Sequence, residues 1–189
     1  MTGCHLMLIH LTDTIKLRFI QRDDTLMEDD LCEALSRACE GCHQQGGCCF
    51  EARPPLSQER IDILMKNGVP GEAIEFEGYR RLRLKPDGYC LLFGNGKCSI
   101  HSIKPETCVA GPFTFDIKER MLQIFLKREG ICPMVGFLKA NPKAYQALFE
   151  TSVAMIMHLV RSIPGAEMAE ILKIDEPETD LVAEIAISS

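Results

Sequence analysis

Hydrophobic and charged residues alternate at period two in the middle of the chain, which is the pattern of half-buried β-strands. Over 79–85 leucines alternate with cationic side chains, and two further short strands are expected at 89–93 and 97–101. Turns that contain glycine, around Gly88 and at residues 94–96, separate these segments. The pattern therefore predicts a three-stranded meander.

Two other regions show the same alternation. Residues 113–117 and 121–126 are separated by a charged Lys-Glu-Arg turn and are expected to form a second hairpin. Near the start of the chain, 13–23 alternates apolar and charged side chains and is expected to form an early strand. At the other end, the chain is expected to finish in an acidic tail.

Apolar residues that recur at spacings of three and four predict helices elsewhere. Residues 27–38 carry acids in the first turn and an apolar face, which is typical of a short helix. Ser57 is expected to cap a second helix, with Ile61, Leu64 and Met65 pointing inward.

The later part of the chain is predicted to be mainly helical. Pro105 can open a single helical turn, and Asn141 and Pro142 are expected to begin a long amphipathic helix as N-cap and first residue. The apolar spacing predicts that this helix runs to about Ile163, and that a shorter one follows at 166–174.

Charge and hydropathy narrow the classes of partner. The net charge of −6 and the pI near 5.4 leave no overall basic field to attract a phosphate backbone. The apolar run at 153–160 has eight residues, far short of the ~20 that span a bilayer. The first residues have neither a basic region nor a small-residue cleavage site. We therefore expect no nucleic-acid partner, no membrane span and a cytoplasmic location.

The ten cysteines are the strongest indication of function in the sequence. A reducing cytosol does not favour a disulfide framework, so metal binding becomes the leading interpretation. Cys4 lies near the start of the chain and Cys32 in an expected helix, and neither is taken as a ligand. The other eight lie at expected loops or strand ends and are the candidate metal ligands: Cys39, Cys42, Cys48, Cys49, Cys90, Cys98, Cys108 and Cys132.

The spacing of these cysteines has chemical consequences. The C-x2-C turn from Cys39 to Cys42 directs two thiolates at one ion, and thiolates select zinc, iron–sulfur clusters or cuprous copper. Adjacent side chains diverge, so Cys48 and Cys49 are expected to serve different sites, or one binds while the other packs or bridges. Eight thiolates suit two four-cysteine sites, or one cluster with additional redox thiols.

Two histidines are further candidate ligands, and the sequence contains no other catalytic motif. His43 follows Cys42, and His101 lies three residues beyond Cys98, so either could be a ligand, although solvated histidines are more common. The sequence has no dinucleotide fingerprint, Walker loop, G-x-S-x-G or H-E-x-x-H motif. Whether the protein is an enzyme is left open.

The cysteine pattern resembles that of the YkgJ-type cysteine cluster family, often described as a zinc- or iron-chelating domain. The similarity covers about 39–132 and is carried by the stretches 39–49 and 90–108. The chain departs from the family pattern in the longer gap that precedes Cys48 and at Lys104, where arginine is usual. The resemblance implies metal binding but no particular reaction, and a related cluster occurs in flagellin lysine methylases.

Together these observations predict an α+β protein in which a small metal-organised core of hairpins and loops packs with C-terminal helices. A single domain, 1–189, is expected, with the cysteine core at about 39–132 and the helical part at about 141–175.

The expected function is metal binding, with a [4Fe-4S] iron–sulfur cluster held by thiolates and a redox or protein-modifying role with a protein partner. The alternatives are a structural Zn²⁺ module that mediates protein interaction, and disulfide or persulfide chemistry at Cys48 and Cys49.

Overall fold

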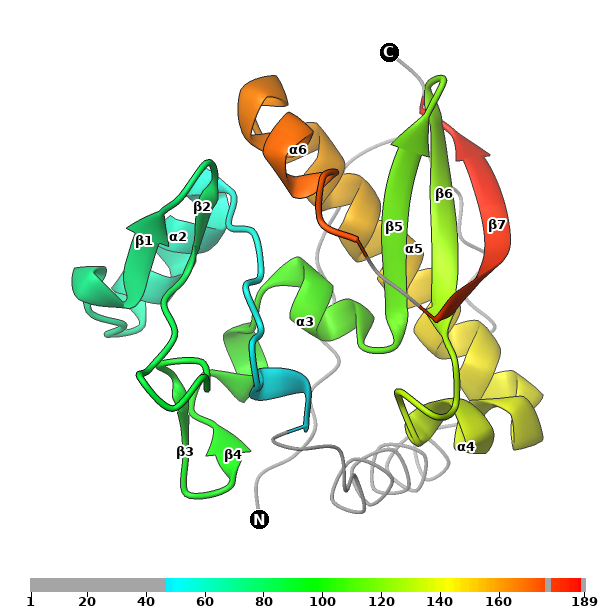
Figure 1. Ribbon diagram of the computed structural model, residues 1–189, viewed down its shortest axis with the longest axis horizontal. Coiled ribbons are helices and arrows are strands. Elements are labelled where there is room, and N and C mark those ends of the chain that lie inside the picture. The colour runs from blue at the N-terminus through cyan, green and yellow to red at the C-terminus, as the bar shows by residue number, and fades with distance from the viewer. Residues whose placement is uncertain (1–46, 176–177, 188–189) are drawn as a thin grey trace, which may run out of the picture.

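The computed structural model describes residues 47–175 and 178–187, so the expected strand at 13–23 and helix at 27–38 lie outside the described residues. The fold is α+β, as the sequence predicts. Short helices and two-stranded sheets form one group of elements, which we call the cysteine lobe (47–104), and a three-stranded sheet with longer helices forms the sheet lobe (113–187) (Figure 1).

The cysteine lobe is built from very short elements. Its strands have two or three residues each, and 3-10 turns join them. In chain order the elements are η1 (Gly47–Cys49), α2 (Gln58–Lys66), η2 (Gly71–Ala73), β1 (Ile74–Phe76), β2 (Arg80–Leu82), β3 (Phe93–Gly94), β4 (Lys97–Cys98) and η3 (His101–Ile103).

Helix α2 begins where the sequence predicts. The hydroxyl oxygen of Ser57 accepts a hydrogen bond of 3.1 Å from the backbone N–H of Arg60, which caps the first turn. Ile61 and Leu64 point into the core, but Met65 is 53% exposed, so the prediction that it points inward is wrong. The buried stripe is centred on Arg60, Ile61 and Leu64, and Met65 lies on the flank of that stripe.

The predicted meander is confirmed in its order of antiparallel neighbours but not as a single three-stranded sheet. Strand β2 pairs with β1, which precedes it in the chain, and β3 pairs with β4 in a separate hairpin. The predicted turn at 85–88 connects the two regions, with an antiparallel bridge between Leu84 and Cys90 and a 2.7 Å bond from the N–H of Lys85 to the carbonyl of Tyr89. The predicted turn at residues 94–96 is confirmed, because Asn95 and Gly96 both have positive φ, as a tight two-residue hairpin loop requires.

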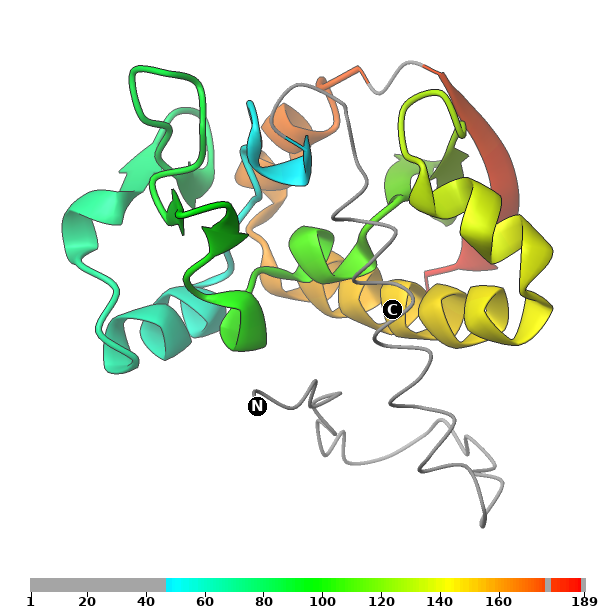
Figure 2. The ribbon, with the colours of Figure 1, turned by 90° about the horizontal axis from the view of Figure 1, so that it is seen from below.

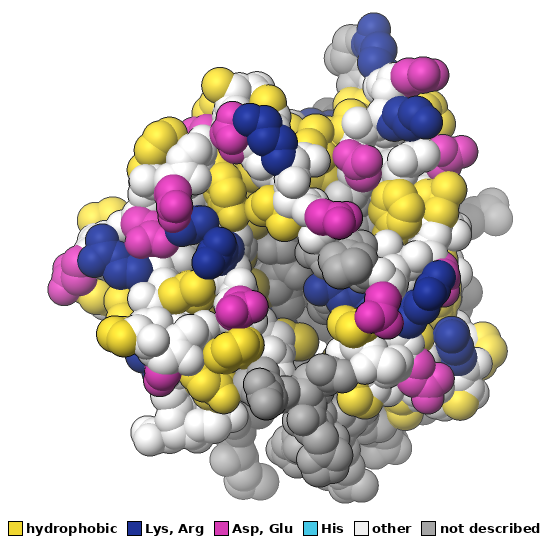
Figure 3. Space-filling model, viewed as in Figure 1, with side chains coloured by type: hydrophobic (Ala, Val, Ile, Leu, Met, Phe, Trp, Pro, Cys, Tyr) yellow, Lys and Arg dark blue, Asp and Glu magenta, His cyan; other side chains and the backbone are white. Residues whose placement is uncertain are grey.

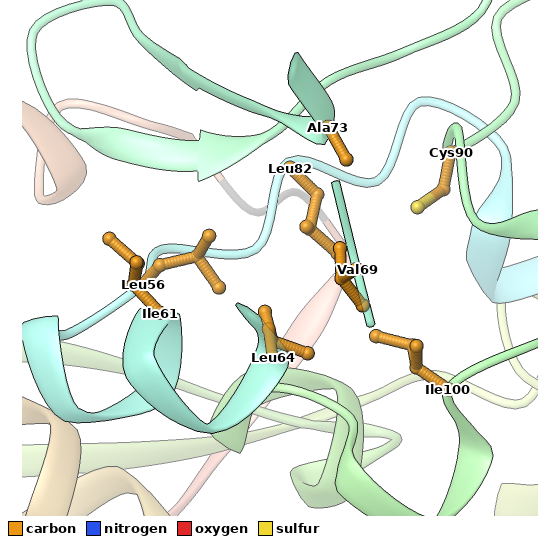
Figure 4. Close-up of a cluster of buried hydrophobic side chains, with 8 residues drawn as sticks. All are labelled: Leu56, Ile61, Leu64, Val69, Ala73, Leu82, Cys90 and Ile100. Carbon is orange, nitrogen blue, oxygen red and sulfur yellow. The ribbon is translucent and has the colours of Figure 1, made fainter. Parts of the chain in front are cut away.

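A small hydrophobic core holds the cysteine lobe together (Figure 4). Residues from α2, β2 and the loops meet in it, and one cysteine thiol is part of it. Its buried members are Leu56, Ile61, Leu64, Val69, Ala73, Leu82, Cys90 and Ile100. In the described residues the lobe is thus organised by apolar packing, and its organisation by a metal remains a prediction.

The sheet lobe contains an antiparallel sheet in the order β5 (Phe113–Lys118), β6 (Met121–Lys127), β7 (Thr179–Ala186). The predicted hairpin of β5 and β6 is confirmed. Strand β7 replaces the expected acidic tail, because residues of this segment pair along the whole of β6. That pairing joins segments far apart in sequence, and local patterning does not reveal it.

Four further helices complete the described fold: α3 (Glu106–Ala110), α4 (Met134–Ala140), α5 (Pro142–Ser162) and α6 (Gly165–Ile171). The long helix is confirmed with Pro142 at its start. The side chain of Asn141 does not cap it, however. Its amide nitrogen donates a 2.8 Å bond to the carbonyl of Phe137 and so closes the end of α4.

Helix α3 lies between the two lobes and packs along α5 (Figure 2). The hydroxyl of Ser152 on α5 is fully buried, 3.1 Å from the carbonyl oxygen of Ala110 and 2.7 Å from that of Leu148. The carbonyl of Ala110 is one of those that a helix end leaves without an internal partner. Ser152 therefore fastens the end of α3 to α5.

Replacing Ser152 with alanine should lower the free energy of unfolding by about 1–3 kcal/mol, since it leaves the carbonyl of Ala110 buried without this donor. Ser162→Ala is the matched control, because its hydroxyl donates only to the carbonyl of His158 within the same helix. Denaturant unfolding measures both. Equal losses in the two variants would contradict the assigned role of Ser152.

Candidate metal centre

Two cysteines are brought together by the backbone at the start of the described chain. Cys49 lies at the end of η1, and the following residue, Phe50, forms an antiparallel bridge with Tyr89. The backbone N–H of Cys90 donates a 2.8 Å bond to the carbonyl of Cys49. The pairing places Cys49 and Cys90 side by side, although they are far apart in sequence.

The hairpin of β3 and β4 adds a third cysteine. Cys98 on β4 pairs with Phe93, whose N–H donates a 2.9 Å bond back to the carbonyl of Cys90. Cys49 and Cys98, both partly buried, pack against the core to which Cys90 belongs. The thiols of Cys49, Cys90 and Cys98 therefore share one region of the cysteine lobe.

Helix α3 carries the fourth cysteine to this region. Negative charge on Cys49, Cys90 or Cys98 raises the pKa of Cys108, which shows that the four sulfur atoms lie within electrostatic reach of one another. We call Cys49, Cys90, Cys98 and Cys108 the thiol quartet. It joins cysteines from η1, the Tyr89–Cys90 segment, β4 and α3.

Burial and repulsion between neighbouring thiolates raise the pKa of three members of the quartet, Cys49, Cys90 and Cys108. Burial is the largest cause that raises the pKa of Cys49 to about 11, and negative charge on Cys98 and Cys90 adds to it. Burial also raises the pKa of Cys108 to about 12, while the ammonium group of Lys104 acts in the opposite direction. A thiolate at Cys49 or Cys108 is therefore unfavourable unless a cation accompanies it.

One backbone group favours a thiolate within the quartet. Burial raises the pKa of Cys90, but a hydrogen bond from the backbone of Leu92 and the charge of Lys85 lower it. Backbone N–H groups that donate to sulfur are common around metal-binding thiolates, and the Leu92 contact is an arrangement of this kind.

Three aromatic rings lie beside the quartet, and the sequence pattern does not predict this arrangement. Tyr89 stacks on Phe93 with ring centres 5.0 Å apart, and Phe50 meets Tyr89 edge-on at 5.4 Å. The ammonium of Lys85 lies 5.7 Å from the centre of the Tyr89 ring and donates a 2.8 Å bond to the carbonyl of Phe93. Their position next to cysteines along the chain is the only signal that could have identified them.

This aromatic group requires glycine in the preceding turn. Gly88 has a φ of +86°, and a Cβ atom placed on it would lie 2.8 Å from the ring of Phe50. Any side chain there would push Phe50 away from Tyr89, and with it the backbone bridge that places Cys49 beside Cys90.

The remaining predicted ligands are distributed differently. Cys48 is exposed, and Cys132 precedes α4, where it packs against the core of the sheet lobe. Cys39, Cys42 and His43 lie outside the described residues. His101 is exposed on η3, and the charge of Lys104, with burial, lowers its pKa. The assignment of all eight cysteines as ligands therefore remains a prediction.

The donor set of the quartet fits a soft or borderline metal. It consists only of sulfur, which suits zinc and iron–sulfur clusters, and not of the oxygen atoms that magnesium and calcium require. Within 47–175 and 178–187, no three His, Cys, Asp or Glu side chains converge closely enough to hold an ion as they stand. A bound cation would reverse the repulsion that now keeps the thiols protonated.

A family model identifies this region of the chain. The model is named CxxCxxCC, carries the description "Putative zinc- or iron-chelating domain", and matches residues 38–133, or 96 of the 189 residues. The chain belongs to the CxxCxxCC family. The resemblance seen in the sequence is thereby confirmed, and the family's description supports metal binding by zinc or iron.

The matched segment contains all eight candidate cysteines and ends one residue after Cys132. No curated protein and no solved structure matches the chain. Among the described residues no helix is long and apolar enough to cross a membrane. On the face shown in Figure 3, basic and acidic side chains are interspersed.

In the metal-free protein, alkylation of Cys49 should keep accelerating as the pH rises from 9 to about 11, because its reactive thiolate forms only near the raised pKa. Short pulses of iodoacetamide followed by mass spectrometry give the rate. Denatured protein is the control, and there the rate should level off near pH 9. A native rate that levels off with the denatured one would contradict the burial of this thiol.

Proposed function

We propose that the thiol quartet holds a metal centre of the iron–sulfur type, [4Fe-4S], and that the protein serves a redox or protein-modifying role with a partner protein. The carrying observation is the quartet itself: four buried or partly buried thiols from separate elements, in which negative charge on Cys49, Cys90 and Cys98 adds to the effect of burial on the pKa of Cys108. Such an arrangement is unfavourable for free thiolates and favourable for a cationic centre. When bound, an iron–sulfur cluster supplies one-electron transfer.

The surrounding groups have roles that suit this proposal. The thiolates of the quartet would hold the centre, and the ammonium groups of Lys85 and Lys104 would offset part of their negative charge. The backbone N–H of Leu92 would orient the sulfur of Cys90. Phe50, Tyr89 and Phe93 would limit the access of water. Hydrogen bonds to sulfur and exclusion of solvent are the means by which proteins tune cluster potentials.

A structural Zn²⁺ ion in the same quartet is the second candidate, and a different observation favours it. Strands of two and three residues and a core of eight buried residues give the cysteine lobe little cohesion of its own. In small domains of this kind, zinc binding contributes directly to the free energy of folding. The protein would then be a binding module, and its centre would carry no electrons.

Metal and acid-labile sulfide analysis of protein purified without oxygen, together with a visible spectrum, separates the two. About one sulfide per iron and a brown colour that bleaches on reduction would support the cluster. Zinc without sulfide would replace it with the structural ion. Protein that binds neither metal after reconstitution under reducing conditions would contradict the proposed function.

Serine substitutions test which thiols hold the centre. We expect Cys90→Ser and Cys108→Ser each to remove most of the bound metal, because serine provides no thiolate to a site built for sulfur. Cys4→Ser and Cys32→Ser are the controls, since both positions precede the matched family segment, and they should retain wild-type metal content. Metal content is measured by mass spectrometry of the elements. Equal retention in all four variants would exclude the quartet as the site.

The same measurement on Cys132→Ser tests the prediction that this cysteine is a ligand. Cys132 packs against the core of the sheet lobe, whereas Cys49, Cys90 and Cys98 lie in the cysteine lobe and Cys108 lies on α3 between the lobes. Full metal content in Cys132→Ser would restrict the centre to thiols outside the sheet lobe. A loss equal to that of Cys108→Ser would extend the centre across both lobes.

A further inference from the structure

A buried ion pair lies directly next to the segment that carries Cys108. Arg60 on α2 and Glu106 at the start of α3 are 6% and 1% exposed. The guanidinium donates from Nε and Nη2 to the same carboxylate oxygen, Oε1, at 3.0 and 2.9 Å. Its third nitrogen, Nη1, donates to the carbonyl of Ile103 at 3.2 Å.

One side chain therefore fixes both ends of a short segment. Ile103 and Glu106 bracket Lys104, the cation that acts on the thiols of Cys49 and Cys108, and Cys108 follows two residues after Glu106. A planar guanidinium with several donors can hold two acceptors in fixed relative positions, which lysine cannot do. The position of Cys108 relative to the cysteine lobe thus depends on Arg60.

The carboxylate depends equally on its partner. The second oxygen of Glu106, Oε2, is buried and has no hydrogen-bond partner among the described residues. Its first oxygen, Oε1, accepts both of its hydrogen bonds from Arg60. Buried ion pairs are seldom a source of net stability, because well-packed apolar residues of similar volume often serve as well or better. The pair therefore calls for an explanation other than stability.

We propose that Arg60 and Glu106 are positioning residues of the metal centre, which hold the Cys108 thiolate toward the other three thiols of the quartet. The inference rests on the proposed function of the quartet. Neither residue touches the metal. They act through the backbone of the segment from Ile103 to Cys108, and the pair connects this segment to α2, which contributes Ile61 and Leu64 to the core of the lobe.

Cobalt binding tests the proposal without knowledge of the native metal. Apoprotein prepared under reducing conditions is titrated with Co²⁺, and the thiolate-to-cobalt absorption band reports both affinity and the number of bound thiolates. Arg60→Met should weaken Co²⁺ binding by roughly 10–100-fold, as loss of groups that orient metal ligands typically does. It should also diminish the band per bound ion, because the Cys108 thiolate no longer reaches the ion.

The matched control is Arg80→Met. Arg80 forms an ion pair of 2.9 Å with Glu167 and so joins β2 to α6, where neither element carries a quartet cysteine. This variant should bind Co²⁺ as the wild type does, with an unchanged band. Arg60→Lys should give an intermediate affinity, since it restores the charge but cannot hold Ile103 and Glu106 together.

A double substitution distinguishes loss of ligand positioning from unfolding of the variant. Arg60→Met leaves the carboxylate of Glu106 buried without its partner, whereas Arg60→Met combined with Glu106→Leu removes both charges and should remain folded by circular dichroism. Weak cobalt binding and a diminished band in this folded variant would support the proposal. Wild-type affinity and band would overturn it and leave the proposed function intact. A wild-type protein that binds no Co²⁺ would overturn both.

Discussion

The position of helix α3 determines whether the four thiols of the quartet can come together. Helix α3 has five residues, too few to be stable alone, so its structure depends on its neighbours. Ser152 fastens its C-terminal carbonyl to α5, and Arg60 holds the carboxylate of Glu106 at its start. Because Cys108 lies between these two attachments, the thiol quartet can form only where the cysteine lobe and α5 both contact α3.

The quartet has a second constraint, which is electrostatic. Four sulfur atoms in a partly buried region cannot all ionise, because burial and mutual repulsion raise the pKa of Cys49 and Cys108 far above the ordinary value. The structure supplies Lys104 and Lys85 as partial compensation. A divalent ion or an iron–sulfur centre would neutralise the negative charge that remains on the thiolates, and the thiol protons would be released to solvent.

Local signals in the sequence predict the helices that begin at residues with distinctive conformational preferences. Ser57 marks the start of α2, and Pro142 marks the start of α5, since capping and a fixed φ are properties of single residues. The partners of the strands are not local. Strand β7 and the aromatic contact of Phe50 with Tyr89 depend on segments far apart in the chain. For the same reason the cysteine spacing predicts thiolate chemistry, but not which thiols form the quartet.

Helix α3 is attached to α5 at one end and to α2 at the other, and these attachments determine how the metal centre and the two lobes influence each other. On α5, helix α3 is held by packing along the helix and by the hydroxyl of Ser152, whose one hydrogen is shared between the carbonyls of Ala110 and Leu148. The three donors of Arg60 fix the opposite end of α3 to α2 in both position and orientation. A metal ion that draws the thiol of Cys108 toward Cys49, Cys90 and Cys98 would therefore act on α3 against both attachments. Metal binding at Cys108 would therefore reach α2 through Arg60 and Glu106, and α5 through the packing of α3, which connects the metal centre to both lobes.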